Sequence, residues 1–494
     1  MSRRDPRQPS AARAARRSTG DAAKAAKPAN ASDLTDSTPD VPKSDPPESP
    51  ARHSTGRRGH PHSLPRASRA LRIIGPGLIT GAADDDPSGI GTYSQSGAAF
   101  GYALLWTALY LLPLMIAIQE MCARIGLVTG QGLAGVVRRH YNRYILFGAV
   151  LLLFIANTIN VGADLGAMVA SVGLLVPAVP AIPLLIVIAL TVLGLEIFVP
   201  YHYYARILKY LALSLLAYVV TGFIVGGDWR ALLAATLVPH VEFTPEYLTL
   251  LVAIVGTTIS PYLFFWQASE EVEENVEFQR ELDATTASRR KTALTSKLKR
   301  IQVDTITGML AATITFWFII QTTAGTLHTH GVTNIQTAAE AAKALEPFAR
   351  GLPFAGQIAK AVFALGIVGT GLLAVPVLAG SAAYGVAEAF GWHEGLSQIF
   401  SHARGFYGVI AASTVLGLLF NLLGVNPIAA LVLAAVINAI VAVPLLALLL
   451  LIANNRAIMG DFTNGRLSNI VGLITFIGMG VAAIFSLVSL VLGR

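Results

Sequence analysis

Charged residues are scarce in this chain of 494 residues. Only 13% of the residues are Asp, Glu, Lys or Arg, while 54% are hydrophobic. An ordinary soluble domain carries about 25% charged residues. Together with a mean hydropathy of +0.59, this composition excludes a soluble globular protein and predicts an integral membrane protein that crosses the bilayer many times.

Cysteine is almost absent as well. The single cysteine, Cys122, lies in an apolar stretch, which excludes an intramolecular disulfide and any multi-cysteine metal site. We expect a buried thiol that packs as a small hydrophobic side chain. The sequence contains no G-x-x-x-x-G-K-[ST] loop, which argues against ATP-driven pumping by this chain. It also shows no nucleophile–base pair or metalloprotease motif, so we expect neither an enzyme nor a bound cofactor.

The charge that is present is concentrated at the N-terminus. Residues 1–72 hold 15 Lys and Arg against 7 Asp and Glu, so the rest of the chain is almost neutral. A segment rich in Pro, Ala, Ser and Arg and poor in aromatic residues cannot bury enough apolar surface to fold, and it lacks the apolar core of a signal peptide. We predict a disordered basic cytoplasmic tail over residues 1–71, solvated rather than lipid-bound, before a transporter domain over residues 72–494. Charge alone gives no support for nucleic-acid binding.

Candidate membrane spans follow the tail. A span needs about 20 apolar residues. Eleven stretches qualify: 74–98, 101–123, 145–174, 181–200, 206–226, 247–269, 302–326, 357–390, 405–423, 427–453 and 467–491. Lys and Arg gather in the loops after spans two, four, six and ten, which places these loops and the N-terminus in the cytoplasm. An odd number of spans then places the C-terminus outside.

Two of these spans are interrupted. The first contains Asp86-Pro87 and the sixth contains Ser260-Pro261. Proline removes a backbone N–H and crowds the preceding turn, so each pair predicts a helix break. Breaks are tolerated in lipid only where the freed backbone groups line a cavity or are buried in protein. Because the breaks lie five spans apart, they occupy matching places in two halves of opposite topology. This is the pattern of secondary transporters with inverted repeats and a substrate site at mid-membrane.

The first break follows three consecutive aspartates, Asp84, Asp85 and Asp86. A carboxylate inside a membrane span is costly and is a functional hypothesis by default. Successive helical residues point about 100° apart, so the three cannot all face one site. Asp86 adjoins the proline, where the chain leaves helical geometry. We predict that Asp86 contacts the substrate, rather than serving as a vestibule charge. Oxygen ligands of this kind suit magnesium, calcium and manganese, whereas an anionic substrate would need helix N-termini.

Three motifs resemble a known family. GPGLITGAADDDPSG, Gly75 to Gly89, looks like the first helix of the Nramp (natural resistance-associated macrophage protein) metal-ion transporters, where Gly-Pro-Gly is followed after eight residues by Asp-Pro-Gly-Asn. GTTISPYLFFWQ falls where the family has Ala-Thr-Ile-Met-Pro-His, and NNRAIMGDFTNGRLSN resembles the loop before the last helix. The similarity covers about residues 72–492. It implies an all-α integral membrane protein of eleven transmembrane helices, with a LeuT-type inverted repeat of five plus five helices and one extra helix. It also implies transport of divalent cations, often with protons.

The resemblance implies a set of metal-binding residues. The family's metal-binding Asp falls on Asp86, its Asn ligand on Gly89, its backbone-carbonyl ligand on Thr257 and its Met ligand on Ser260. Gly89 has no side chain, and loss of the sulfur at Ser260 removes a preference for soft transition metals. Family members without that Met are linked to magnesium. We therefore predict a divergent branch whose site takes hard ions of the manganese and magnesium class.

Positions that the family associates with proton movement differ too. The His after the proline of span six is Tyr262, and the Glu of span three is Ala167. The family's Gln in span ten falls on Val436, with Asn438 two residues later. A proton relay needs titratable groups within reach of one another. The carboxylates that remain for such a relay are Asp84, Asp85 and Asp164.

Other polar residues have structural as well as functional interpretations. Asn157, Asn160 and Asp164 share one face of span three, where they either bond between helices or line a pathway. We expect Gln95 and Asp304, which match polar positions of the family, to be structural or gating residues. The acidic run Ser269–Asp283 fits a solvated helix better than a cation-attracting inner mouth. We expect ordinary exposed histidines in the external loops at His240, His328 and His330.

The sequence thus predicts a secondary active transporter of divalent metal cations that works by alternating access in a bacterial inner membrane. The metal is the substrate, and the partners are metal ions, the lipid bilayer and, if transport is coupled, protons. Two alternatives stay open. One is a transporter of the same fold for another cation or small solute. The other is a membrane metal sensor without transport.

Overall fold

The computed structural model describes residues 76–199, 213–283 and 286–492, and every regular element in these ranges is a helix. The predicted tail lies outside the described residues. The first half contains α2 (Pro76–Asp84), α3 (Pro87–Phe100), η1 (Gly101–Leu104), α4 (Trp106–Thr129), α5 (Leu133–His140), α6 (Arg143–Gly173), α7 (Ala181–Phe198), η2 (Leu213–Leu215), α9 (Leu216–Val225) and α10 (Trp229–Leu237).

The second half of the chain continues in the same way. It contains α11 (Pro245–Thr258), α12 (Pro261–Glu274), α13 (Val276–Asp283), α14 (Ala287–Thr326), η3 (His328–His330), α15 (Ala338–Lys343), η4 (Glu346–Ala349), α16 (Ala355–Phe390), α17 (Arg404–Asn421), α18 (Pro427–Asn454), α19 (Arg456–Met459), η5 (Gly460–Phe462) and α20 (Arg466–Leu492).

The described residues include eight helices that are long and apolar enough to cross a membrane, with α11 and α12 counted as one. The other three predicted spans correspond to the broken pair α2 and α3, to α9 with a beginning outside the described residues, and to α17, which has 18 residues. The all-helical membrane fold is confirmed, while the count of eleven spans stays a prediction.

Both predicted helix breaks are present. The first separates α2 from α3, and the second separates α11 from α12. One boundary differs clearly from the sequence-based prediction: α14 begins at Ala287 and runs for 40 residues, whereas the apolar stretch starts near residue 302. The added residues are rich in Lys, Arg, Ala and Leu, which are good helix formers. The helix therefore continues beyond the apolar region.

Glycines let the broken helices approach their neighbours closely. A Cβ on Gly81 of α2 would collide with the backbone of Gly308 in α14, and a Cβ on Gly256 of α11 would collide with the backbone of Ala435 in α18. Small residues at such crossings are typical of membrane helices, which associate through close packing rather than through a hydrophobic driving force. The half-helices that carry the two breaks are thereby fixed against unbroken helices.

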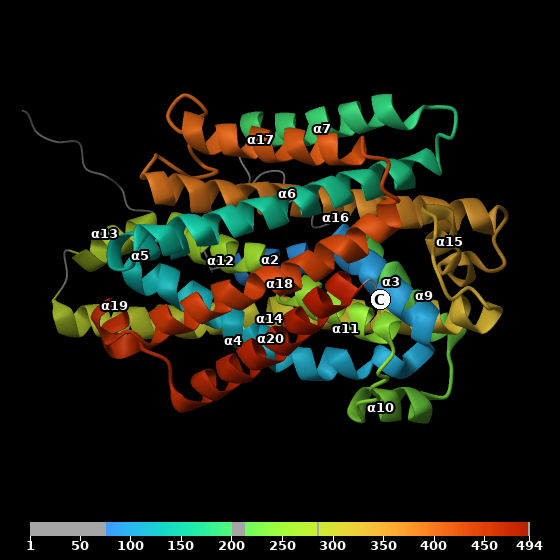
Figure 1. Cartoon of the computed structure of the whole chain (residues 1–494), viewed down its shortest axis with the longest axis horizontal. Helices are drawn as coiled ribbons and strands as arrows, with labels where there is room; N and C mark the ends of the chain where they lie inside the picture. Colours follow the sequence, from blue (N-terminus) through green and yellow to red (C-terminus); the bar gives the residue numbers. More distant parts are fainter. Residues whose placement is uncertain (1–75, 200–212, 284–285, 493–494) are drawn as a thin grey trace, which may run out of the picture. The chain divides into compact units, whose positions relative to one another are not determined.

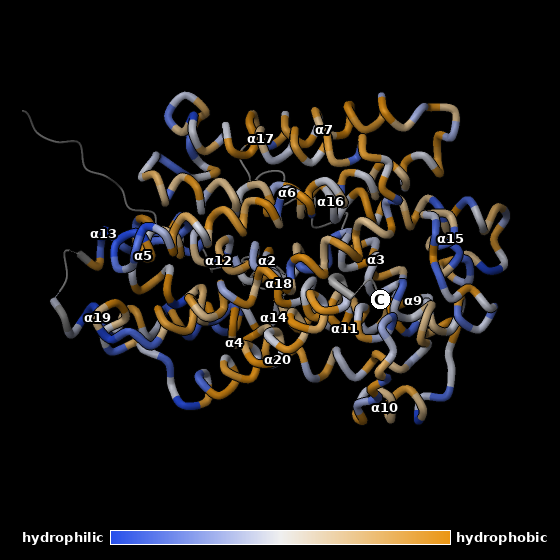
Figure 2. The backbone as a smooth tube through the Cα atoms, viewed as in Figure 1, coloured by the Kyte–Doolittle hydropathy of each residue, from blue (hydrophilic) through white to orange (hydrophobic). Residues whose placement is uncertain are grey.

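The helices run between two polar ends. Figure 1 shows α5, α13, α19 and the start of α14 at one end, and α15 at the opposite end. We call these the basic end and the α15 end. At the basic end, Lys291 of α14 contacts Asp461 of η5 at 2.8 Å. Figure 2 shows the polar backbone colours concentrated at both ends and apolar colours along the helices between them. The sequence predicts that four loops rich in Lys and Arg lie on the same side of the membrane. Three of them lie at the basic end, and the fourth, after span four, lies outside the described residues.

Candidate functional site

The first helix break is built around Asp86. This residue is the N-cap of α3 and has an extended backbone, with φ −66° and ψ 170°, as expected for the residue before a proline. Its carboxylate Oδ1 accepts a hydrogen bond of 2.6 Å from the Gly89 backbone N–H. A negative side chain is favoured at this place because a helix N-terminus carries partial positive charge. The local sequence thus both breaks the helix and anchors the carboxylate.

The second break has a serine in the corresponding position. Ser260 precedes Pro261 and is the N-cap of α12, but its side chain makes no cap hydrogen bond. Instead its hydroxyl donates to the carbonyl oxygens of Gly256 at 2.8 Å and Thr257 at 2.6 Å. These carbonyls belong to the last turn of α11, where helical partners are missing. The Ser260 hydroxyl therefore satisfies backbone groups that the break sets free.

Direct contacts join the two breaks. The Ser88 hydroxyl donates to Asp86 Oδ1 at 2.7 Å and lies 3.2 Å from the Thr257 hydroxyl of α11. From α12, the Tyr262 hydroxyl donates to the Ala83 carbonyl at 2.9 Å, and it lies 3.4 Å from Asp86 Oδ2. Oxygen atoms from α2, α3, α11 and α12 thus gather around one carboxylate. Sequence reasoning did not assign Ser88 to the site, although it occupies the position after Asp86-Pro87.

The structure brings the four predicted site residues into one buried region. Asp86 and Ser260 are fully buried, and Thr257 is 1% exposed. Thr257 meets Asp86 through Ser88, and Ser260 touches Thr257 directly. Gly89 contributes its backbone N–H, since it has no side chain. Their assignment as metal ligands stays a prediction.

A fifth helix, α6, also contributes to the surroundings of Asp86. Asn160 donates from Nδ2 to Asp86 Oδ2 at 3.1 Å. Asp164, one turn further on, lies near the Ser88 backbone N–H without reaching hydrogen-bond geometry. Asn157 differs: its Nδ2 donates to the Leu378 carbonyl and the Ser381 hydroxyl of α16. The polar face of span three is therefore divided between a helix–helix contact at Asn157 and the candidate site at the other two residues.

The two preceding aspartates diverge from Asp86. Asp84 is fully buried, and neither of its carboxylate oxygens has a hydrogen-bond partner in the described part of the chain. Asp85 is 4% exposed and approaches the Thr315 side chain of α14. This divergence follows from the angle of about 100° between successive helical residues. Only Asp86, at the break itself, contacts both halves of the site.

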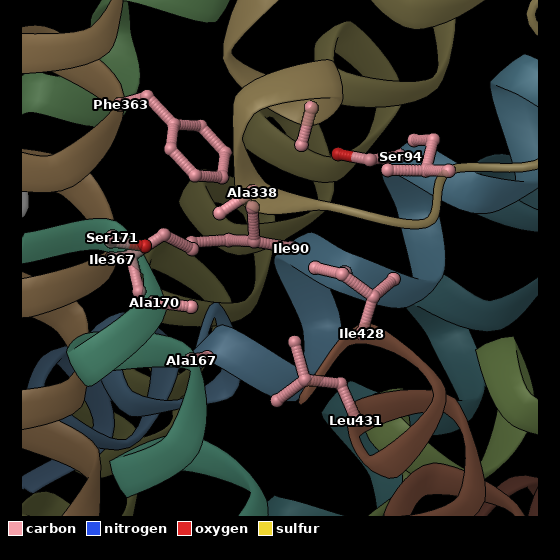
Figure 3. A pocket seen from close by; sticks show the side chains of 13 residues that line it. Ile90, Ser94, Ala167, Ala170, Ser171, Ala338, Phe363, Ile367, Ile428 and Leu431 are labelled. Carbon is pink, nitrogen blue, oxygen red and sulfur yellow. The ribbon is translucent and has the colours of Figure 1, made fainter. Parts of the chain in front are cut away.

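The path toward the α15 end is closed by apolar side chains and a loop. Figure 3 shows a small apolar cavity beside α3, lined from several helices by residues that include Ile90, Phe363, Ile367 and Leu431. Beyond it lies a wider cleft between α3, α11 and α18. Ile335 lines both spaces, and its N–H donates to the Gln95 side chain at 2.8 Å. The loop that carries Ile335, between α14 and α15, therefore separates the candidate site from this cleft.

The path toward the basic end is closed by polar contacts of α2. The Gly77 N–H donates to Asp304 of α14 at 2.7 Å, and the Thr80 hydroxyl donates to Gln267 of α12 at 2.5 Å. Gln267 in turn donates to Glu271, one turn further along α12. With both paths closed, the site is occluded in this structure.

Residues 77–489 match the family model described as natural resistance-associated macrophage protein-like, Nramp. The chain belongs to the Nramp family. The divalent metal cation transporter MntH of Verminephrobacter eiseniae is 29% identical over 410 residues, which cover 81% of this chain and 84% of that protein. MntH of Deinococcus radiodurans is 26% identical over 448 residues, or 87% and 93% of the two chains.

The structural comparison agrees with the Nramp assignment. A crystal structure of the Eremococcus coleocola manganese transporter superimposes with a TM-score of 0.68 at 18% identity, over 88% of this chain and 89% of that one. At this identity the likeness shows the fold. The resemblance inferred from the motifs is thus confirmed, and with it the all-helical membrane fold of a transporter family rather than an enzyme.

The acidic run behaves differently from its sequence-based interpretation. We expected a solvated helix over Ser269–Asp283, but its first part, within α12, is buried: Glu270 is 7% and Glu271 1% exposed. Glu273 accepts hydrogen bonds from the backbone N–H groups of Leu396 at 3.0 Å and Ser397 at 2.6 Å. The expectation was wrong for Glu270 and Glu271 because α12 packs against both α4 and α16.

The external histidines make local contacts. His328 Nδ1 lies 2.8 Å from the Ala98 carbonyl, and His330 approaches the Thr326 carbonyl. Over the described residues, no group of three or more His, Cys, Asp or Glu side chains is placed to hold a metal ion. The region around Asp86 is a different kind of site, because it combines one carboxylate with hydroxyl, amide and carbonyl groups.

Proposed function

We propose that this Nramp protein is a secondary active transporter of divalent metal cations that works by alternating access. The observation that carries the proposal is the fully buried Asp86 carboxylate, held at a break in one membrane helix and joined through Ser88 to a break in another. A buried carboxylate needs a compensating partner, and a cation would supply one. The relatives named as divalent metal cation transporters support the same substrate class.

The ions that we propose are manganese and magnesium. Hard cations prefer oxygen ligands, whereas softer transition metals prefer sulfur and imidazole. The groups around Asp86 are the hydroxyls of Ser88, Thr257 and Tyr262 and the amide of Asn160. The possible metal ligands in this set are therefore oxygen atoms of hydroxyl and amide groups, and the set contains neither a sulfur atom nor an imidazole. Binding of magnesium as well as manganese is therefore part of the proposal.

Cotransport of a proton is a further part of the proposal. Asp164 lies on α6 beside the site, close to Ser88 and within electrostatic reach of Asp86. Together with Asp84 and Asp85 it replaces the His and Glu that the resemblance associates with proton movement. If protons accompany the ion, manganese uptake acidifies the lumen of a vesicle, which an enclosed pH dye measures. Uptake without acidification would show uncoupled transport.

We also propose that the basic end faces the cytoplasm of a bacterial inner membrane and that the N-terminus lies on that side. The support is the excess of Lys and Arg in loops that share this end, including Arg138 beside α16 and Lys291 beside η5. Accessibility of cysteines placed at the two ends to an impermeant thiol reagent in whole cells tests this orientation.

Uptake of manganese and magnesium into proteoliposomes tests the function itself. We expect both ions to enter, and Asp86→Ala to abolish uptake because, among the described residues, Asp86 is the carboxylate that contacts both breaks. Asp461→Ala is the matched control, since Asp461 is exposed at the basic end, with a side-chain exposure of 65%. Unchanged uptake in a folded, inserted Asp86→Ala protein would remove Asp86 from the site. A wild type that moves no divalent ion would favour another solute, and one that binds without transport would favour a sensor.

A further inference from the structure

Asn160 is a buried amide in direct contact with the Asp86 carboxylate. It is fully buried in α6, and its Nδ2 donates to Asp86 Oδ2 at 3.1 Å. Its Oδ1 has no hydrogen-bond partner in the described part of the chain. A buried polar atom without a partner destabilises the folded protein. This amide oxygen therefore lies unused next to the one carboxylate that contacts both breaks.

The residue at the position where the family has an amide ligand has no side chain in this protein. That position is Gly89 in α3. A Cβ on Gly89 would lie 3.1 Å from a ring carbon of Tyr93, 3.2 Å from the Asp84 carbonyl oxygen and 3.4 Å from Asp86 Oδ1. These contacts leave little room for a longer side chain. An amide that serves the Asp86 carboxylate must then come from another helix, and Asn160 is the amide that reaches it.

We propose that Asn160 supplies an amide-oxygen ligand to the transported divalent cation, in place of the asparagine that is missing at position 89. The proposal rests on the function proposed above for the Asp86 site. Without an ion, the amide N–H faces the carboxylate, as the structure shows. A half-turn of the terminal amide exchanges Nδ2 for Oδ1, and this torsion is soft and nearly two-fold. With an ion bound, both the carboxylate and the amide oxygen can then face the positive charge.

The chain offers a closely matched control residue. Asn157 is also fully buried on α6, three residues earlier, and its Oδ1 likewise has no hydrogen-bond partner in the described part of the chain. Its Nδ2, however, donates to the Leu378 carbonyl and the Ser381 hydroxyl of α16 rather than to Asp86. It makes a helix–helix contact and lies outside the ion site. Loss of the Asn157 amide should therefore affect stability without changing ion affinity.

Manganese binding to the purified full-length protein, measured by titration calorimetry, tests the proposal. Asn160→Leu keeps the approximate shape and removes the amide. We expect the dissociation constant for manganese to rise at least about tenfold, a change of about 1.4 kcal/mol. Asn160→Asp keeps an oxygen but loses the N–H donor, and we expect it to bind manganese at least as tightly as wild type. We expect Asn157→Ala to bind as wild type does. If Asn160→Leu does not fold, Asn160→Ala makes the same test.

Each other outcome has a definite meaning. Binding by a folded Asn160→Leu protein that equals wild type overturns the ligand role. Binding by Asn160→Asp that is as weak as that of Asn160→Leu also overturns it, because Asn160 would then act only by donating a hydrogen bond to Asp86. Both results leave the proposed function in place if wild type still binds manganese. A wild type that binds no divalent cation removes the proposed function and this inference together.

Discussion

At the scale of single residues, the ion selectivity of the site depends on which oxygen atoms can face an ion. The side chains of Ser88, Asn160 and Tyr262 and the Gly89 backbone N–H contact the Asp86 carboxylate, and they come from α3, α6 and α12. The hydroxyl of Ser260 is turned away toward the last carbonyls of α11. A serine at this position is compatible with an oxygen-lined site because it brings no sulfur. In this structure its hydroxyl also occupies the Thr257 carbonyl, which the family resemblance names as a ligand.

Replacing Ser260 by methionine should change selectivity. A thioether favours softer ions, so we expect wild type to bind manganese and magnesium within about tenfold of each other, and Ser260→Met to shift the ratio toward manganese or cadmium by at least about tenfold, or about 1.4 kcal/mol. Competition assays on both proteins measure this ratio. Ser260→Ala is the control, since it removes the hydroxyl without adding sulfur. An unchanged ratio in Ser260→Met, or a wild type that binds cadmium far better than magnesium, would contradict the hard-site interpretation.

At the scale of helices and loops, the candidate site is closed to solvent by a loop at one end and by polar contacts of α2 at the other. Toward the α15 end, Gln95 of α3 accepts from the Ile335 N–H at 2.8 Å and donates to the Thr333 carbonyl at 3.2 Å. Asn426, the N-cap of α18, donates to the Gln336 carbonyl at 2.9 Å. The loop between α14 and α15 is thus clamped across two helices by side-chain amides. The predicted structural or gating role of Gln95 corresponds to this clamp.

Loss of the Gln95 amide should open the clamp more often. Gln95→Ala removes two hydrogen bonds, each worth about 1 kcal/mol net, so we expect external access to the loop to rise roughly thirtyfold. With Cys122, the single cysteine, replaced by serine, Ile335→Cys reports this access, because Ile335 is only 3% exposed. The measurement is the labelling rate with an impermeant thiol reagent. Gln336→Ala is the control, since only its backbone carbonyl takes part. Equal labelling rates with and without Gln95 would show that apolar packing alone holds the loop.

Close helix packing makes a second prediction at this scale. Gly81 of α2 lies directly against the backbone of Gly308 in α14, and a backbone cannot move aside as a flexible side chain can. We expect Gly81→Ala to destabilise the folded protein by about 1–3 kcal/mol, the usual cost of overpacking, and to lower the melting temperature in detergent. Gly478→Ala in α20 is the control, because a Cβ there meets open space. A Gly81→Ala protein that melts at the wild-type temperature would show that α2 can shift relative to α14.

At the scale of the whole molecule, the helices described here enclose the candidate site completely. Polar contacts of α2 close it toward the basic end, and the clamped loop closes it toward the α15 end. Alternating access would require these two closures to open in turn. All residues that form them lie between positions 76 and 492, within the range that matches the Nramp family model or at its edge.

Removal of residues 1–60 should therefore leave transport nearly unchanged. The composition of this segment gives it too little apolar surface to pack as a core, and the site contacts of the described residues are all made within residues 76–492. Manganese uptake into proteoliposomes, compared at equal protein abundance, measures the effect. A scrambled tail of equal composition separates a role of charge from a role of sequence. Loss of uptake after truncation would make the tail part of the mechanism.

The sequence by itself determined the membrane class, the two helix breaks, the position of Asp86 at the first break and the family. These features are local, because a proline removes a hydrogen bond wherever it stands in a helix, and a carboxylate in an apolar span must be compensated. Only the tertiary structure decided which side chains complete the site. Asn157 and Asn160 share a helix face and one residue type, yet one bonds α16 and the other Asp86. The hydrogen-bond partners of Gln95 and the burial of Glu271 could not be predicted from the sequence either. The physical reason is that these contacts join residues far apart in the chain, and they depend on how each helix is rotated against its neighbours.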